Sequence, residues 1–156
     1  MTDGTNVPNI VGTGEVNPGA TPMVVVSNFP DPLICEKVGD DTWKLHHRFR
    51  YIRQRAGAEE TITVPKNYIT DFASVPELFW NIVPKDGRWD GAAVIHDYIY
   101  GLRGADCKPA RTRAECDWIF YEGMGVLGVP QWKRWMMWTA VRLFGVGPWN
   151  KGGLKQ

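Results

Sequence analysis

The stretch from Asp90 to Tyr100 places polar groups inside an otherwise apolar run, and it constrains the fold more than any other part of the sequence. The spacing predicts a helix, on which residues three and four apart are neighbours. One face of that helix would carry Ala93, His96, Asp97 and Tyr100. We therefore expect a base, a carboxylate and a phenol to converge there.

The run from Thr112 to Tyr121 predicts a second helix, because it opens with a Thr-x-x-Glu capping box. Asp117 lies among the apolar positions of this helix, so its carboxylate should face inward. A buried carboxylate needs a hydrogen-bond partner. His96 is the obvious partner, and we expect the two helices to pack with these side chains in contact.

Length and composition limit the classes of protein that the chain can belong to. A chain of 156 residues with 44% apolar content and eight Trp can build one substantial core. The formal net charge of +1 argues against a protein that binds nucleic acid through overall charge, and no nucleic-acid partner is expected. The start lacks the basic residues of a signal peptide, and the apolar runs are shorter than a membrane span, which indicates a soluble chain. Three scattered cysteines indicate free thiols in a reducing compartment.

The order of patterns along the chain predicts the α+β class. Residues 1–21 lack apolar periodicity and are expected to form a flexible N-terminal arm that orders only against a partner. Residues 22–156 are expected to form a single domain, β-rich over 22–65 and helical over 76–145. The expected architecture is therefore an arm and a small antiparallel β-sheet, followed by a half with three helices.

The strongest strand signal runs from Trp43 to Tyr51, where apolar residues and an inward His47 alternate with charged residues. A turn within Gln54–Ala58 leads this strand back into Glu60–Val64, which predicts a hairpin. Weaker strand signals lie at Met23–Val26 and Leu33–Val38.

Outside the central pair, we expect the third main helix and one additional short helix. Glu77–Ile82 is expected to be a short helix, capped by Asp71 or Ser74 from the loop Thr70–Pro76. Gln131–Phe144 is expected to be the last helix, with Gly145 as its stop signal and its Trp residues in the core.

The His-Asp constellation permits two interpretations. A His and two Asp in a small aromatic protein can form a hydrogen-bonded structural network without turnover. A His oriented by a buried carboxylate can also serve as a general base near neutral pH, while a neighbouring carboxylate holds a hard cation. The second combination suits metal-assisted ester hydrolysis.

The motif Asp90-x-Ala92-Ala93-x-x-His96-Asp97-x-x-Tyr100, followed by Ala114-x-x-Asp117-x-x-Phe120, resembles the catalytic helix pair of phospholipases A2. It is especially similar to the capsid-borne domains of parvoviruses and to the small bacterial and fungal enzymes. The resemblance covers about residues 70–125 and implies a phospholipase A2-like helical half. It implies that His96 activates water, Asp117 orients His96, and Tyr100 supports the network. By the same resemblance Asp97 would ligate calcium. Asp71, from the loop Thr70–Pro76, is a second candidate metal ligand, although Asp in such a loop is more often a cap.

Two features depart from the phospholipase pattern. The glycine-rich calcium loop of those enzymes is replaced here by Thr70–Pro76, and the disulfides of their secreted members are absent. The implied partner is a phospholipid or membrane surface.

Most of the chain also resembles a family of small tailed-phage proteins catalogued as domain of unknown function 1353. The resemblance rests on Thr-Asp-Phe-Ala-Ser-Val-Pro at 70–76, Ile-His-Asp-Tyr-Ile-Tyr at 95–100 and Ala-Val-Arg-Leu-Phe-Gly at 140–145. It implies a protein made in the host cytoplasm without a signal peptide. The chain would then be either a lipid-directed enzyme or a virion protein of the tail or neck, attached to other virion proteins through its N-terminal arm.

A third interpretation is a metal-dependent phosphohydrolase with a His-Asp motif, whose ligand order is matched by His47, His96-Asp97 and Asp117. It ranks lower, because those domains are helical throughout and His47 lies in a strand pattern.

Overall fold

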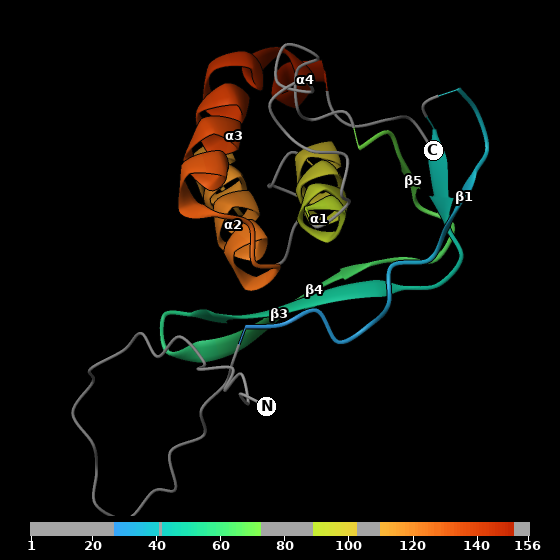
Figure 1. Ribbon diagram of the computed structural model, residues 1–156, viewed down its shortest axis with the longest axis horizontal. Coiled ribbons are helices and arrows are strands. Elements are labelled where there is room, and N and C mark those ends of the chain that lie inside the picture. Colours follow the sequence, from blue (N-terminus) through green and yellow to red (C-terminus); the bar gives the residue numbers. More distant parts are fainter. Residues whose placement is uncertain (1–26, 41, 73–88, 103–109, 152–156) are drawn as a thin grey trace, which may run out of the picture.

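The computed structural model describes residues 27–40, 42–72, 89–102 and 110–151, and these residues form the expected α+β fold. Figure 1 shows a helical layer resting on a long β-hairpin, with a smaller sheet to one side. The strands pair into two small antiparallel sheets, one with the order β1-β2-β5 and one made of β3 and β4. The expected arm at 1–21, the strand at Met23–Val26 and the helix at Glu77–Ile82 lie outside the described residues.

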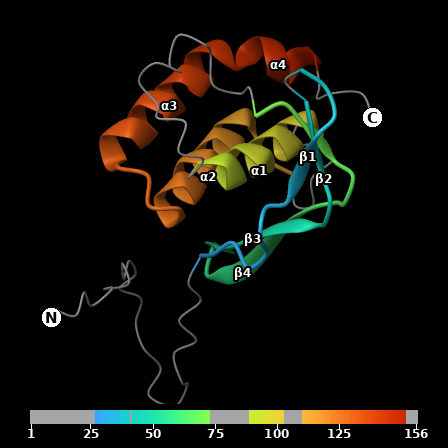
Figure 2. The ribbon, with the colours of Figure 1, turned by 45° about the vertical axis from the view of Figure 1, so that its right-hand side comes forward.

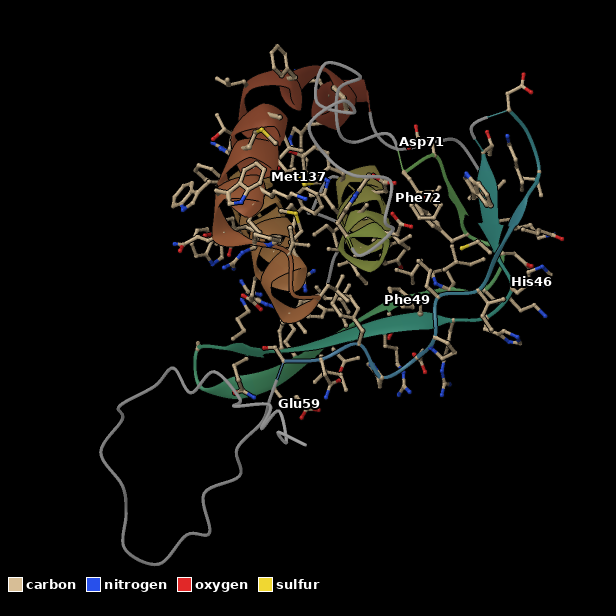
Figure 3. The ribbon with its side chains drawn as sticks, viewed as in Figure 1. His46, Phe49, Glu59, Asp71, Phe72 and Met137 are labelled. Carbon is tan, nitrogen blue, oxygen red and sulfur yellow. The ribbon has the colours of Figure 1, made fainter. Side chains whose placement is uncertain are left out.

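The hairpin consists of β3 (Phe49–Arg55) and β4 (Ala58–Val64), joined by a two-residue turn. Both turn residues, Ala56 and Gly57, have positive φ angles of 49° and 81°. Positive φ at both positions is typical of the type I′ turn, whose twist matches that of the flanking strands. The hairpin expected from the sequence is therefore confirmed. Its alternate residues point into the core, and Figure 3 shows Phe49 on the side facing α1 and Glu59 on the opposite side.

The prediction of one continuous strand from Trp43 to Tyr51 is wrong. The chain bends at His46 and His47, so that β2 (Trp43–Leu45) and β3 belong to different sheets. In the smaller sheet β2 pairs with β1 (Cys35–Lys37) and β5 (Ile69–Thr70). The bend interrupts the alternation, and His47 is exposed rather than inward.

The described residues after β5 form four helices: α1 (Asp90–Gly101), α2 (Arg113–Val126), α3 (Gln131–Phe144) and α4 (Val146–Lys151). The first three agree with the sequence prediction, and the capping box between Thr112 and Glu115 is present at the start of α2. The short helix α4 was not expected, because Gly145 was predicted as a stop signal. Gly145 does end α3, but the chain then turns directly into another helix. Figures 1 and 2 agree that α1 lies between the α2–α3 pair and the smaller sheet, with the hairpin beneath the helices.

Small residues let α1 and α2 approach each other closely. A Cβ atom on Gly123 of α2 would lie 3.2 Å from the Cβ atom of Ala92 on α1 and 3.3 Å from the ring of Phe29. On the hairpin side, a Cβ atom on Gly91 would lie 3.0 Å from the ring of Phe49. This close approach brings the inward side chains of both helices within hydrogen-bond range of each other.

A charged network fastens the hairpin to α2. Arg53 on β3 donates to both carboxylate oxygens of Glu122 at 3.0 and 2.9 Å, and to Glu60 on β4 at 2.8 Å. Arg111 also donates to Glu60, at 2.6 Å, and the Tyr51 hydroxyl donates to Glu122 at 2.7 Å. Bidentate Arg–carboxylate pairs of this kind fix orientation as well as distance.

The expectation that the Trp residues of α3 lie in the core is wrong for Trp132 and Trp135. The buried residues of α3 are Met137, Ala140 and Val141, whereas Trp132 and Trp135 are exposed. Figure 3 shows Met137 on the side of α3 that faces α1. Apolar residues occupy most of the circumference of this helix, so its sequence did not indicate which stripe would be buried.

Candidate functional site

The centre of the candidate site is the carboxylate of Asp117, which lies between α1 and α2. Nε2 of His96 is 3.1 Å from Oδ1 of Asp117, and the Tyr100 hydroxyl donates to the same oxygen. The side chains of His96 and Asp117 are 1% and 0% exposed. The structure thus brings together the three residues that the sequence singled out as catalytic candidates.

Two arginines, neither of which was expected here from the sequence, hold the other oxygen of Asp117. Arg142 on α3 donates to Oδ2 at 2.7 Å, and Nη1 of Arg113 lies 3.7 Å from the same oxygen. Arg113 also donates to the last carbonyl groups of α3, those of Val141 and Arg142, at 3.3 and 3.1 Å. The spacing of Arg113 and Asp117, four residues apart on one helix, was a usable signal. Arg142 gave no comparable signal, because its approach depends on how α3 packs against α2.

Burial and hydrogen bonding act in opposite directions on Asp117. Burial alone would raise the pKa of its carboxyl, but hydrogen bonds from His96, Tyr100 and Arg142 hold that pKa below its usual range. Burial raises the pKa of Tyr100, and the hydrogen bond to Asp117 raises it further. Asp117 is therefore an anion that only accepts hydrogen bonds, and Tyr100 is a neutral donor.

The second ring nitrogen of His96 is unusual for a buried polar atom. Nδ1 is inaccessible to solvent and has no hydrogen-bond partner in the described part of the chain. The rings of Tyr100 and Phe120 flank the imidazole, with centroids at 4.1 and 4.9 Å. Because Asp117 can only accept, Nε2 carries the proton in the neutral ring and Nδ1 keeps a free lone pair. The arrangement can therefore accept a proton at Nδ1.

Asp97, next in the chain to His96, points to a different set of groups. Its Oδ2 accepts a hydrogen bond of 2.6 Å from the hydroxyl of Thr70, which in turn accepts one of 3.3 Å from the amide of Phe72. Phe72 has a φ of +48°, which is rare for a bulky residue. Figure 3 shows Asp71 and Phe72 at the end of β5, on the side of α1 opposite α3.

Asp71 and Asp97 share one electrostatic neighbourhood. Burial raises the pKa of the Tyr68 hydroxyl, and the negative charges of Asp97 and Asp71 raise it further. The two carboxylates and the Thr70 hydroxyl are oxygen groups that could contribute to a cation site here. Calcium takes about six to eight oxygens, and the described ranges contain no group of three or more His, Cys, Asp or Glu that could hold a metal. A calcium ion held here by Asp97 and Asp71 would therefore need further oxygens, from backbone carbonyls or water.

His47, a ligand in the phosphohydrolase interpretation, is exposed at the bend between β2 and β3, whereas His96 and Asp117 are buried between helices. Within the residues that the structure describes, this ligand order does not come together as a metal cluster.

Comparison with known proteins places the chain in a family. A family model described as "Protein of unknown function (DUF1353)" matches residues 43–141, which include His96, Tyr100 and Asp117, while Arg142 lies one residue beyond the match. The "Uncharacterized protein y4jT" of Sinorhizobium fredii (strain NBRC 101917 / NGR234) is 38% identical over 84 residues, which are 53% of this chain and 23% of that protein. The chain thus spans less than a quarter of the length of that relative. No solved structure matches. Because the family model covers well over half of the sequence, the chain belongs to the DUF1353 family.

Proposed function

We propose that this protein is a phage-encoded, phospholipase A2-like ester hydrolase in which His96 is the general base. The observation that carries the proposal is the state of the His96 ring: Asp117 holds Nε2, while the buried Nδ1 has no partner in the described residues. A buried polar atom without a partner costs free energy, and such atoms often serve catalysis. A base that awaits water or substrate accounts for this cost.

The proposed reaction uses the residues of the cluster as follows. Nδ1 of His96 removes a proton from a water molecule, whose oxygen attacks the ester carbonyl. Asp117 stabilises the resulting imidazolium through Nε2, and Tyr100 keeps the carboxylate in place. The proton then passes from Nδ1 to the alcohol oxygen as the carbon–oxygen ester bond breaks. The products are a fatty acid and a lysophospholipid.

Water must reach Nδ1 for this reaction to occur. Nδ1 is closed off from solvent in this structure. Turnover therefore requires a local opening beside the imidazole, of the kind that loops and short elements undergo on microsecond to millisecond timescales.

One observation favours a second candidate, a non-catalytic virion protein of the tail or neck. Arg142 and Arg113 occupy the Asp117 oxygen that His96 leaves free, so the carboxylate has partners on α1, α2 and α3. A carboxylate that joins three helices in this way is also an effective structural element.

A hydrolysis assay distinguishes the two candidates. The protein is incubated with phosphatidylglycerol and phosphatidylethanolamine, both as vesicles and as short-chain monomers, in calcium and in chelator, and fatty acid release is measured by mass spectrometry. Release supports the hydrolase, and its loss in chelator supports a calcium ion held through Asp97 and Asp71. Release that persists in chelator removes the cation from the proposal. No release under any of these conditions contradicts the hydrolase and leaves the structural candidate.

A further inference from the structure

Large apolar side chains are exposed along one side of α2 and α3. Trp118, Trp132, Trp135 and Leu143 are 48%, 59%, 45% and 67% exposed. We refer to these four residues as the aromatic surface. An isolated exposed apolar side chain is ordinary, but several neighbouring ones mark an interaction site.

The aromatic surface is continuous across the two helices. On α3, Trp132, Trp135 and Leu143 recur at the spacing of one helical face, on the side away from the buried Met137 and Ala140. Ring contacts connect it to α2, with centroid distances of 5.1 Å from Trp118 to Tyr121 and 5.3 Å from Tyr121 to Trp135. Figures 1 and 2 both show α3 at the outside of the helical layer.

Positive charge accompanies these rings. The Lys133 ammonium lies 5.5 Å from the centre of the Trp132 ring, and the Arg134 guanidinium lies 4.9 Å from that of Tyr121. No Asp or Glu occurs in the sequence after Glu122, whereas that segment contains Lys133, Arg134, Arg142, Lys151 and Lys155. Arg142 is engaged with Asp117, but its charge still adds to a segment without acidic residues.

We propose that the aromatic surface binds an anionic lipid bilayer, with α3 lying in the plane of the interface. Trp side chains favour the boundary between lipid headgroups and acyl chains, and adjacent Lys and Arg are attracted to anionic headgroups. In the described residues no helix is long and apolar enough to cross a membrane, and binding at the surface needs no such helix. A protein partner could cover the Trp rings equally well, but the acid-free basic segment specifically complements an anionic surface.

This inference goes beyond the proposed hydrolase and does not depend on it. Figure 3 shows Asp71 and Phe72 on the side of α1 opposite α3, so the aromatic surface is not the wall of the Asp97 region. A lipid-bound face would serve a hydrolase and a virion protein alike.

Vesicle co-sedimentation tests the proposal. The wild-type chain should bind vesicles that contain phosphatidylglycerol and should bind pure phosphatidylcholine much more weakly. Trp132→Ser with Trp135→Ser should weaken binding at least about tenfold, because both changes remove apolar area from the interface. Lys133→Gln should weaken binding to anionic vesicles about fivefold and change binding to phosphatidylcholine little.

A matched control replaces exposed apolar residues elsewhere. Ile34 and Val38 flank β1 and are 45% and 49% exposed, and Ile34→Ser with Val38→Ser should leave vesicle binding unchanged. Equal loss in both double variants, or equal binding to anionic and neutral vesicles, would overturn the proposal. So would a wild-type chain that binds no vesicles but forms oligomers that the Trp variants dissociate, because the surface would then join copies of the chain. Hydrolysis of short-chain monomers without vesicle binding would contradict the lipid-binding surface and support the hydrolase. Vesicle binding without hydrolysis would support the lipid-binding surface and contradict the hydrolase.

Discussion

Arg142 donates a hydrogen bond of 2.7 Å to Oδ2 of Asp117 and thereby joins α3 to α2 at the centre of the fold. Asp117 is fully buried, so its charge has lost its hydration and depends on protein donors. Arg142 therefore both neutralises the carboxylate and leaves Oδ1 free for His96 and Tyr100. The position of the last helix is thus connected directly to the state of the candidate base.

Replacing Arg142 should destabilise the protein through Asp117. Arg142→Gln removes the closest positive charge from a buried carboxylate, and we expect the free energy of unfolding to fall by about 2 kcal/mol. Urea denaturation gives this value. Arg50→Gln is the matched control, because Arg50 pairs with Asp31 at 2.8 Å near the surface, where solvent screens the pair, and this change should lower the free energy of unfolding much less. An equal fall in the free energy of unfolding of both variants would contradict the prediction, because the buried pair would then stabilise the fold no more than the surface pair.

The lowered pKa of Asp117 predicts acid sensitivity. Burial opposes ionisation, but the hydrogen bonds from His96, Tyr100 and Arg142 prevail, so the folded chain binds this proton at lower pH than the unfolded chain does. The contribution of Asp117 to stability is therefore complete above the unfolded pKa and is lost as the pH falls from that pKa through the lower folded pKa. In urea titrations across this range, the stability advantage of the wild type over Asp117→Asn should shrink toward acid. A constant difference across the range would contradict the prediction.

Two glycines near the last turn should respond differently to the same substitution. A Cβ atom on Gly145 would collide with the carbonyl oxygen of Val141 and lie 2.9 Å from the Tyr100 hydroxyl. Gly145→Ala should therefore displace α4 or Tyr100 and lower the free energy of unfolding by about 1 to 3 kcal/mol. At Gly147 a Cβ atom would meet nothing within 4 Å, so Gly147→Ala should be neutral or slightly stabilising. Thermal melts of both variants make the comparison, and similar shifts would contradict it.

The parts of this structure that the sequence predicted are those set by local pattern. The α1 and α2 helices and the β3–β4 hairpin each carry their own signal, in helical spacing, a capping box and an alternating pattern with a turn. The contact between His96 and Asp117 was also predicted from the sequence, because inward positions on two packed helices restrict which side chains can meet.

The remaining features depend on packing between distant segments. The bend at His46 and His47 has no local signal, because the residues on either side keep the alternation of one strand. The buried stripe of α3 could not be predicted from a helix that is apolar on most sides, so Trp132 and Trp135 were wrongly expected in the core. Arg142 reaches Asp117 across 25 positions of sequence, a distance that no spacing rule covers.

If calcium is part of the site, Asp97 should be its main anchor. Thr70 already donates to Asp97 at 2.6 Å, and Asp71 lies in the same electrostatic neighbourhood. Asp97→Asn keeps the size of the side chain but removes its charge, and we expect calcium affinity to fall at least about tenfold. Calorimetric titration with calcium measures this affinity in both proteins. An Asp97→Asn protein with unchanged affinity would exclude this geometry.

Substitution of His96 separates the two candidate functions, because each assigns the imidazole a different role. His96→Gln has a similar size and can still donate to Asp117, but it removes the group that accepts a proton from water. In the hydrolase, fatty acid release should fall by about 100-fold or more, while folding changes little. In the structural protein there is no turnover to lose, and the free energy of unfolding should fall by about 1 to 3 kcal/mol, because the amide satisfies the buried carboxylate imperfectly.

His47→Gln is the control for both measurements, since His47 is exposed and outside the Asp117 cluster. It should change neither hydrolysis nor the melting temperature. Loss of release in His96→Gln at an unchanged melting temperature would establish His96 as a catalytic base. If the wild type releases no fatty acid and His96→Gln melts at a lower temperature than the wild type, the cluster has a structural role. Equal release by wild type and His96→Gln would show that hydrolysis, if present, occurs elsewhere in the molecule.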